Sequence, residues 1–461
     1  MKFLTKTQLK WYFTWLASCY LLLTLIGVAL LSTEGVNWRE SLDLLLPHFR
    51  NPGLWLFLSI PYLGFLLLRY LFSIYKKAGF RTFAKKLGML VLLPAALLFS
   101  AFKISDWYTG SEQFDYTWDY EIENSLDSVR QFHTIDGKYR GVHLFGTRRL
   151  EFVDFDPLVK NNIEWIVLVP YGWQEDHRST SIRWQGRRRQ SQAERDSSMI
   201  LLIEKARHKG IQTIIKPHIW LGRPSPDKWR SDIEFEKEEE WASWSKDYRE
   251  WILHYARLSE ALQLPLFCIG TELFQLVKTR PDFWRNLIRD IRKVYSGKLT
   301  YAANWHDEYE AVDFWGELDY IGIQAYFPLT NKQNPGTEDL VRGWKPHLKA
   351  LQAFSKKYDK PILFTEIGYK STPDAAIEPW QWANTVEGMY TKISNETQVN
   401  CYEAFFKAVW PEPWFAGALL WQWHARHYRD ERDKDINFTP QNKPAENIIA
   451  RWFNKVVKKK S

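Results

Sequence analysis

The chain has 461 residues, 62 basic and 54 acidic side chains, and a formal net charge of +8. This modest excess, without a compact Lys/Arg block outside the flanks of the apolar segments, excludes a dedicated nucleic-acid surface. The length accommodates an α/β barrel of roughly 250–320 residues and a further segment.

Three apolar segments occupy the first hundred residues. Residues 11–32 carry no charge and are long enough to cross the ~30 Å hydrocarbon core of a bilayer. Further apolar segments run from about residue 54 to 75, with Arg69 near one end, and from about 87 to 102. The first segment is longer than the apolar region of a cleavable signal peptide. The sequence therefore predicts a membrane anchor over residues 1–104 with three transmembrane helices.

The basic residues around these segments predict an orientation. Three lysines precede the first segment, and five basic residues lie between the second and third. The loop between the first and second segments has only Arg39 and Arg50, together with three acidic residues. Positive-inside bias then places the N-terminus in the cytoplasm, and three crossings leave residues 105–461 outside it.

The part of the chain after the anchor divides into a short linker and a long domain. Residues 105–136 are acidic and aromatic, without periodicity, and we interpret them as a juxtamembrane linker that partly packs under the domain at residues 137–461. In that domain eight apolar runs predict strands. They are residues 139–145, 163–171, 211–219, 266–272, 299–304, 318–326, 362–366 and 417–423.

Helical patterns separate these strands. They cover residues 193–208, 241–262, 282–295, 337–358, 396–410 and 445–456. Gly210 follows the first of them at a position where glycine commonly ends a helix. Strands that alternate with helices indicate parallel βα units, and eight of them fit a closed barrel better than an open sheet. The predicted fold is therefore α/β, a (β/α)8 TIM barrel preceded by three transmembrane helices.

Two of the predicted strands end in a glutamate, in Leu266–Glu272 and Pro361–Glu366. The C-terminal ends of barrel strands converge on one cleft, so Glu272 and Glu366 can act on one bond. Retaining glycoside hydrolysis needs such a pair, with carboxyl groups roughly 5–5.5 Å apart. Taken alone, either glutamate could equally be a strand-end carboxylate in a salt bridge. The pair favours catalysis, with a partly desolvated Glu272 holding a proton and Glu366 ionised.

Other polar residues at strand ends are candidates for substrate binding. Tyr326 ends the strand before Glu366 and is the natural hydrogen-bond donor to its carboxylate. Lys216 and His218 end the third strand, where Lys216 would reach sugar hydroxyls. Pro217 between them also suits a purely structural exit from the strand.

Asn304 ends the fifth strand, where it either lines the cleft or caps the next helix. His143, on the first strand, is more typical of a satisfied core histidine. Trp421 and Trp423 are two residues apart on the eighth strand and are expected to face the same side. Trp423 lies nearer the C-terminal end and is the better platform for a sugar ring, with Trp173 as a further candidate.

No metal site or cofactor is expected. The chain has no HExxH motif and no Cys/His cluster. Its three cysteines, Cys19, Cys268 and Cys401, have no metal-ligand spacing, and we predict no disulfide among them.

Seven segments carry a family resemblance: IIKPHIW (214–220), WRSDIEF (229–235), CIGTEL (268–273), LDYIGIQAYFPL (318–329), LFTEIGY (363–369), LLWQWH (419–424) and INFTPQNKPAENIIARWF (436–453). Between Gly141 and about Phe453 the chain resembles the retaining barrel glycosidases, and within them the family 113 endo-β-1,4-mannanases. The resemblance implies a mannan-like polysaccharide or oligosaccharide as substrate. It also implies that Glu272 is the acid/base and Glu366 the nucleophile.

The chain departs from the wider clan in two respects. Many members have Asn before the acid/base, where it binds the sugar 2-hydroxyl, whereas this chain has Thr271, which is compatible with the axial 2-hydroxyl of mannose. The anchor is the second departure, and it leaves open another envelope or exported glycan as substrate. A third alternative is a non-catalytic glycan-binding membrane protein, which would need no matched acid and base.

Overall fold

The computed structural model describes residues 6–33, 52–109, 128–147, 149–184, 186–187, 190–225, 227–382, 392–425 and 435–457. It divides the chain into two compact units, Met1–Asp106 and Trp107–Ser461. Of the predicted linker, residues 110–127 lie outside the described part. Residues 128–136 belong to the second unit and pack against the rest of it, since Val129 N–H donates to Lys209 O at 2.9 Å.

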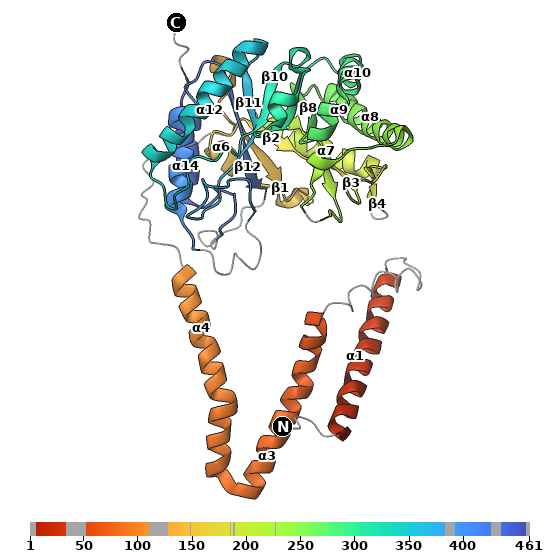
Figure 1. The fold of residues 1–461 in the computed structure, drawn as a ribbon, viewed down its shortest axis with the longest axis vertical. Helices are drawn as coiled ribbons and strands as arrows, with labels where there is room; N and C mark the ends of the chain where they lie inside the picture. Colours follow the sequence, from red (N-terminus) through yellow and green to blue (C-terminus); the bar gives the residue numbers. More distant parts are fainter. Residues whose placement is uncertain are drawn as a thin grey trace. The chain divides into compact units, whose positions relative to one another are not determined.

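The first unit consists of apolar helices (Figure 1). They are α1 (Lys6–Thr33), α3 (Pro52–Leu87), the π-helix η2 (Gly88–Leu92) and α4 (Leu93–Thr109). Helices α1 and α3 pack antiparallel, because Trp15 Nε1 donates to Leu58 O at 2.9 Å and Tyr62 Oη donates to Gln8 O at 2.8 Å.

Two segments of this unit are long and apolar enough to cross a membrane, Thr7–Ile26 and the 44-residue Leu58–Ala101. The second and third predicted spans both fall mainly in the longer segment. It is interrupted at Gly79, whose φ of 73° and ψ of 176° are not helical. A residue with a side chain rarely adopts this conformation, which glycine adopts readily.

The second unit contains the predicted closed barrel of eight parallel strands, in the order β1-β12-β11-β10-β9-β8-β6-β2. Figure 1 shows helices surrounding these strands. The barrel strands are β1 (Tyr139–Phe145), β2 (Trp165–Leu168), β6 (Gln212–Ile215), β8 (Leu266–Thr271), β9 (Lys298–Asn304), β10 (Tyr320–Gln324), β11 (Ile362–Ile367) and β12 (Phe415–His424).

The second and third predicted strands are each divided in two by a proline. Beyond Pro170 and Pro217 the chain leaves the barrel and forms a separate parallel pair, β3 (Tyr171–Gln174) and β7 (His218–Leu221). Proline has no N–H for the sheet ladder, so the barrel pairing ends there. The small sheet carries Trp173 paired with Trp220.

The six predicted helices are present as α7 (Gln192–His208), α8 (Glu238–Ala261), α10 (Pro281–Arg292), α12 (Thr337–Tyr358), α14 (Asn395–Ala408) and α15 (Pro444–Phe453). Helix α8 begins three residues earlier than predicted, since Glu238–Glu240 favour the positive end of its dipole. Gly210 has the left-handed φ of 73° expected after α7.

Short elements complete the domain. They are α5 (His133–Asp136), η3 (Leu150–Phe152), α6 (Asp156–Lys160), the pair β4 (Gly186–Arg187) and β5 (Gln190–Ser191), η4 (Arg230–Asp232), α9 (Phe274–Thr279), α11 (Glu308–Ala311) and η5 (Trp315–Glu317).

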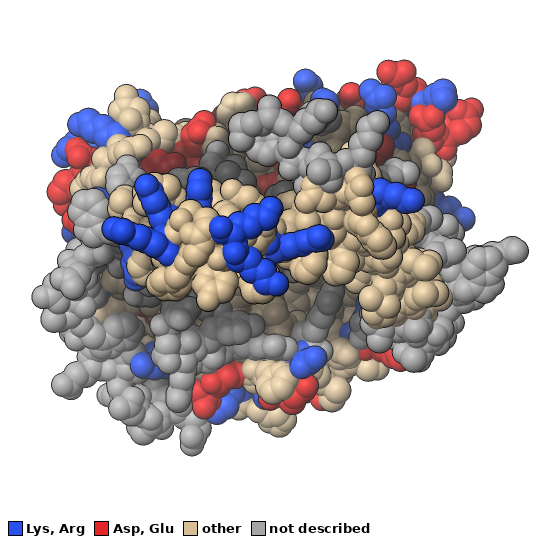
Figure 2. Space-filling model, turned by 90° about the horizontal axis from the view of Figure 1, so that it is seen from below, with Lys and Arg blue, Asp and Glu red and all other residues tan. Residues whose placement is uncertain are grey.

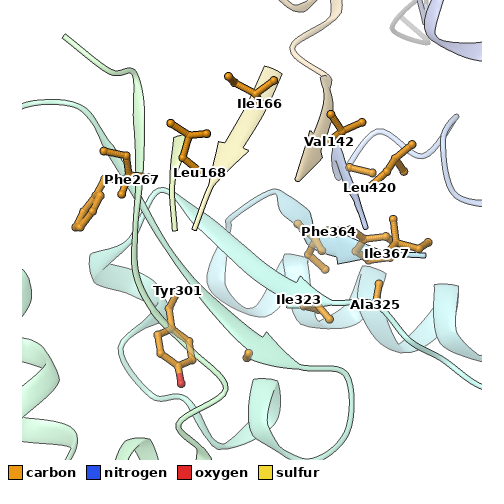
Figure 3. Close-up of a cluster of buried hydrophobic side chains, with 14 of the residues drawn as sticks. Val142, Ile166, Leu168, Phe267, Tyr301, Ile323, Ala325, Phe364, Ile367 and Leu420 are labelled. Atoms are coloured by element: carbon orange, nitrogen blue, oxygen red, sulfur yellow. The ribbon is translucent and has the colours of Figure 1, made fainter. Parts of the chain in front are cut away.

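Alternate residues of the strands enter two separate cores. One set, including Val142, Ile166 and Phe364, belongs to a large cluster that also includes residues of the surrounding helices (Figure 3). The other set, including Trp165 and Leu363, forms a smaller cluster contributed almost entirely by barrel strands. In a closed barrel this second cluster fills the interior, so that the polar residues at the C-terminal strand ends lie on a packed base.

Candidate active site

The two predicted carboxylates lie at the same end of the barrel. Glu272 directly follows β8 and Glu366 is the second-last residue of β11, with exposed fractions of 8% and 6%. Glu272 has a φ of 53°, in the left-handed region that few non-glycine residues adopt. Such a conformation costs of order 1–3 kcal/mol and is retained where the surroundings enforce it.

Lys216 and Gln324 connect the two carboxylates. Lys216 Nζ donates to Glu366 Oε2 at 2.9 Å and to Gln324 Oε1 at 2.6 Å. The other end of the amide, Gln324 Nε2, donates to Glu272 Oε1 at 3.0 Å. Lys216 also donates to Thr365 O at 3.1 Å. Both glutamates therefore belong to one hydrogen-bonded network of largely buried side chains.

Glu366 has a second donor on its other oxygen, since Tyr326 Oη donates to Glu366 Oε1. Burial and the adjacent Glu366 charge raise the pKa of Tyr326 well above its ordinary value, so the phenol keeps its proton. The predicted role of Tyr326 as a donor to Glu366 agrees with this geometry.

His143, assigned to the core from the sequence, is fully buried but contacts the site. Its Nε2 lies 3.1 Å from Lys216 Nζ and 3.9 Å from Glu366 Oε2, and its Nδ1 lies 3.3 Å from Leu420 O. Burial and the Lys216 charge hold the pKa of His143 well below its usual range. A neutral ring that donates from Nδ1 to Leu420 O turns its Nε2 lone pair toward Lys216, whose three N–H groups are then shared among four acceptors.

The second oxygen of Glu272 faces two residues that sequence reasoning did not select. Arg230 Nε lies 3.2 Å from Glu272 Oε2, and Trp229 Nε1 donates to the same oxygen at 3.4 Å. The Arg230 guanidinium lies 4.6 Å from the centre of the Trp229 ring. The segment WRSDIEF, which carries part of the family resemblance, was the available signal for both.

The remaining predicted residues lie close to this network without a described hydrogen bond to either glutamate. His218 is buried and its Nδ1 lies 3.1 Å from Arg230 NH1. The Thr271 hydroxyl is buried and donates to Pro217 O at 3.3 Å. Asn304 is half-buried, and its backbone N–H donates to Glu308 Oε2 at 2.9 Å.

The prediction that Trp423 is the sugar platform is wrong. Trp423 is 1% exposed and packs in the large core between strands and helices, whereas Trp421 lies in a cluster with Tyr326 and Phe438. The rings of Trp421 and His143 are 5.1 Å apart. Regular alternation fails here because the pairing of β1 with β12 shifts register.

Partly exposed tryptophans lie on two sides of the network. Trp220 and Trp229 have ring centres 5.9 Å apart and adjoin Glu272 through Trp229, and half-buried Trp173 lies 6.2 Å from Trp220. On the side of Trp421, Trp382 lies 6.0 Å from its ring. Aromatic faces of this kind stack on the C–H faces of pyranose rings.

Among the residues that the structure describes, no group of three or more His, Cys, Asp or Glu side chains could hold a metal ion. The site itself brings together two carboxylates, one paired with a lysine and a tyrosine and the other with an arginine, beside aromatic surfaces.

Comparison with known proteins agrees with this geometry. Residues 153–443 match the model of Glycoside Hydrolase Family 113. A structure described as a complex of a GH113 β-1,4-mannanase is 26% identical with a TM-score of 0.59, covering 68% of this chain and 98% of that one. The GH113 β-mannanase from Alicyclobacillus acidocaldarius in complex with ManMIm is also 26% identical with a TM-score of 0.58, covering 69% and 97%. No curated protein matches the chain.

The family match spans well over half of the chain and includes both carboxylates and the strands that carry them. The chain is a glycoside hydrolase and belongs to glycoside hydrolase family 113.

Proposed function

We propose that this chain is a membrane-anchored, retaining β-glycoside hydrolase that acts on a β-1,4-mannan-like polysaccharide or oligosaccharide. Glu366 is the nucleophile and Glu272 the acid/base. The observation that carries the assignment is the shared network in which Lys216 contacts Glu366 while its partner Gln324 contacts Glu272. Retaining hydrolysis needs two carboxylates that act on the same glycosidic bond.

In the first step Glu366 attacks the anomeric carbon and forms a glycosyl ester, while Glu272 gives its proton to the departing glycosidic oxygen. The nucleophile must be ionised, and it receives hydrogen bonds from Lys216 on Oε2 and from Tyr326 on Oε1. Its two oxygens are thereby held in a fixed orientation, which reduces the reorganisation needed for attack.

In the second step Glu272, now a carboxylate, takes a proton from water as that water attacks the anomeric carbon. The ester bond to Glu366 breaks and the product leaves with the β configuration. Arg230, 3.2 Å from Glu272 Oε2, is a suitable partner for this carboxylate form.

The proposed substrate class rests on the family and on the β-1,4-mannanases that the chain resembles. The partly exposed Trp220 and Trp229 support a carbohydrate chain that extends beyond the reacting sugar. Because the Thr271 hydroxyl is engaged with Pro217 O, we propose that Thr271 assists by its small size beside the sugar. Comparing product release from β-1,4-mannan, cellulose and an amino-sugar polymer tests this choice, and faster cleavage of either of the last two would overturn it.

The carboxylate roles have a separate test. Glu272→Ala should still react with an aryl glycoside whose phenol is acidic, accumulate as glycosyl-enzyme, and be accelerated by azide to give a β-glycosyl azide. Glu366→Gln should lack this activity. NMR of the first wild-type product should show the β anomer, and an initial α product would mean inversion and a wrong assignment of Glu366.

We further propose that residues 1–104 anchor the enzyme with three spans, that residues 105–136 link the anchor to the domain at 137–461, and that the domain is extracytoplasmic. At 1.5 Å per residue, the 44-residue segment Leu58–Ala101 is about twice as long as one span requires. The non-helical Gly79 offers a point at which two spans can be separated.

The residues around Gly79 suit a membrane surface. Figure 2 shows Lys and Arg side chains gathered where α3 and α4 meet, and the exposed basic residues there are Lys76, Lys77, Arg81, Lys85 and Lys86. Phe80 and Phe83 lie three positions apart, on one face of the helical turn. Basic residues with apolar neighbours favour the headgroup layer of an anionic leaflet, which supports a cytoplasmic position for this bend.

A reporter that is active only in the cytoplasm tests the orientation. Fused after Ser461 it should be silent, and fused near Lys77 it should be active. Activity of the C-terminal fusion would contradict both the topology and an external glycan substrate.

A further inference from the structure

A buried carboxyl group lies behind the acid/base, outside the network that contains Lys216. Glu308, in the first turn of α11, is 1% exposed. Its Oε1 accepts from Tyr301 Oη at 2.6 Å and its Oε2 accepts from the backbone N–H of Asn304 at 2.9 Å. If the hydrogen bond from the Asn304 N–H were its only one, Glu308 would simply stabilise the turn after β9.

The Tyr301 hydroxyl extends this chain of hydrogen bonds to the acid/base. While it donates to Glu308, it accepts the backbone N–H of Leu273 at 2.7 Å. Leu273 follows Glu272, whose own N–H donates to Ala302 O at 2.9 Å. Both peptide N–H groups on either side of the Glu272 side chain are therefore bound to β9.

The tyrosine ring has little freedom to move. It packs against Trp284 and Phe314, with ring centres 5.3 and 5.9 Å away. A Cβ at Gly270 would lie 2.9 Å from Tyr301 Cε2, so the ring also lies directly against the backbone before Glu272. Burial keeps the pKa of Tyr301 well above its ordinary value, so it remains a donor to Glu308.

The backbone that receives these bonds is the left-handed one at Glu272, with φ 53°. A left-handed residue with a side chain persists only where neighbouring groups enforce it. We propose that Glu308, acting through Tyr301, is a positioning residue that holds the Glu272–Leu273 backbone in this conformation and so directs the Glu272 carboxyl toward Gln324 and Arg230. The inference rests on the proposed role of Glu272 as acid/base.

A displaced acid/base impairs protonation of the leaving oxygen more than attack by Glu366. The loss should therefore depend on the leaving group, whereas a merely structural defect lowers the active fraction equally for all substrates. The test measures kcat/KM of the full-length, detergent-solubilised enzyme on two aryl β-mannobiosides, one that releases 2,4-dinitrophenol and one that releases unsubstituted phenol. Their ratio is independent of how much of each preparation is folded.

Tyr301→Phe removes one oxygen atom and should lower kcat/KM about tenfold or more for the phenyl substrate, with little change for the dinitrophenyl substrate. Glu308→Gln keeps an acceptor for Tyr301 and should show the same pattern more weakly. Tyr295→Phe is the matched control, because Tyr295 is also buried and its hydroxyl donates at 2.6 Å to Leu264 O, near the opposite end of β8. It should leave the ratio unchanged.

An unchanged ratio in Tyr301→Phe and Glu308→Gln, with Glu272→Ala still sensitive to the leaving group, would overturn the positioning role alone. If Glu272→Ala is itself insensitive to the leaving group, the proposed acid/base assignment fails and the positioning role fails with it.

Discussion

Lys216 and Glu366 form an ion pair across the barrel, with Nζ 2.9 Å from Oε2 and both side chains almost fully buried. Lys216 follows β6 and Glu366 lies in β11, and these strands are four places apart in the ring of eight. The pair therefore joins opposite walls at the level of the two proposed catalytic carboxylates. Removing one partner of a buried pair leaves the other charge uncompensated, at a cost of about 3–5 kcal/mol.

Lys216→Met should lower kcat/KM by about a hundredfold or more, since it removes a charged donor from the proposed nucleophile. Lys138→Met is the control at the other end of the barrel, where the buried Lys138 donates to Phe415 O at 2.7 Å. It should lower the melting temperature while the folded enzyme keeps its kcat/KM. The test compares the kcat/KM values of the two variants, each normalised to the folded fraction. Equal losses of kcat/KM would contradict a specific role for Lys216.

Substitutions of the two tryptophans of β12 should affect different properties, stability for Trp423 and activity for Trp421. Trp423→Ala removes a core side chain and should cost about 3–5 kcal/mol of folding free energy. Trp421→Ala should reduce kcat/KM more than it reduces stability, because Trp421 adjoins Tyr326 and His143. Thermal unfolding and kinetics of both variants test this, and a larger loss of activity than of stability in Trp423→Ala alone would contradict it.

Glu164 should make folding stability depend on pH. It is fully buried, and burial raises its pKa from 4.5 to about 7, although His133 N–H donates to its Oε2 at 2.9 Å. Between about pH 4.5 and 7 the unfolded chain loses this proton while the folded chain keeps it, so stability falls as the pH rises. Arg140 NH1 lies 3.6 Å from Glu164 Oε1 and opposes this rise in pKa, so Glu164→Gln should lack the slope and gain stability relative to wild type as the pH rises toward 7.

Thermal unfolding of the solubilised enzyme at several pH values measures the effect. The exposed Glu151 provides a control, Glu151→Gln, for the loss of one carboxylate. A Glu164→Gln stability difference that does not grow toward pH 7 would contradict the prediction.

Gly79→Val should disturb the proposed membrane anchor. Its φ of 73° and ψ of 176° are unfavourable for a β-branched residue, so the substitution favours a continuous helix through the bend. We expect more chains with the C-terminus retained in the cytoplasm, read by the cytoplasmic reporter after Ser461. Gly64→Val is the matched control, because Gly64 also has no neighbouring atom within 4 Å of an added Cβ and has no positive φ. Equal reporter signals from the two variants would contradict a role for the bend.

Much of the barrel and the position of its two glutamates could be predicted from the sequence. A barrel strand is apolar over a short run and ends where polar residues begin, so Leu266–Glu272 and Ile362–Glu366 are visible without any partner. The divisions at Pro170 and Pro217 had a local signal too, since proline cannot continue a sheet ladder. Strand ends that converge on one face bring Glu272, Glu366, Lys216 and Tyr326 together.

Only the tertiary structure decided which side chains contact each carboxylate oxygen of Glu272 and Glu366. Gln324 and Arg230 reach Glu272 from β10 and from the turn η4, and no spacing along the chain encodes which side chains meet across a barrel. Trp421 and Trp423 lie in different clusters because the register of β12 shifts against both of its neighbouring strands. A pattern of alternation along one strand contains no information about such shifts. Local pattern determines which residues are buried and where strands end, whereas contacts across the barrel depend on closure, register and side-chain packing.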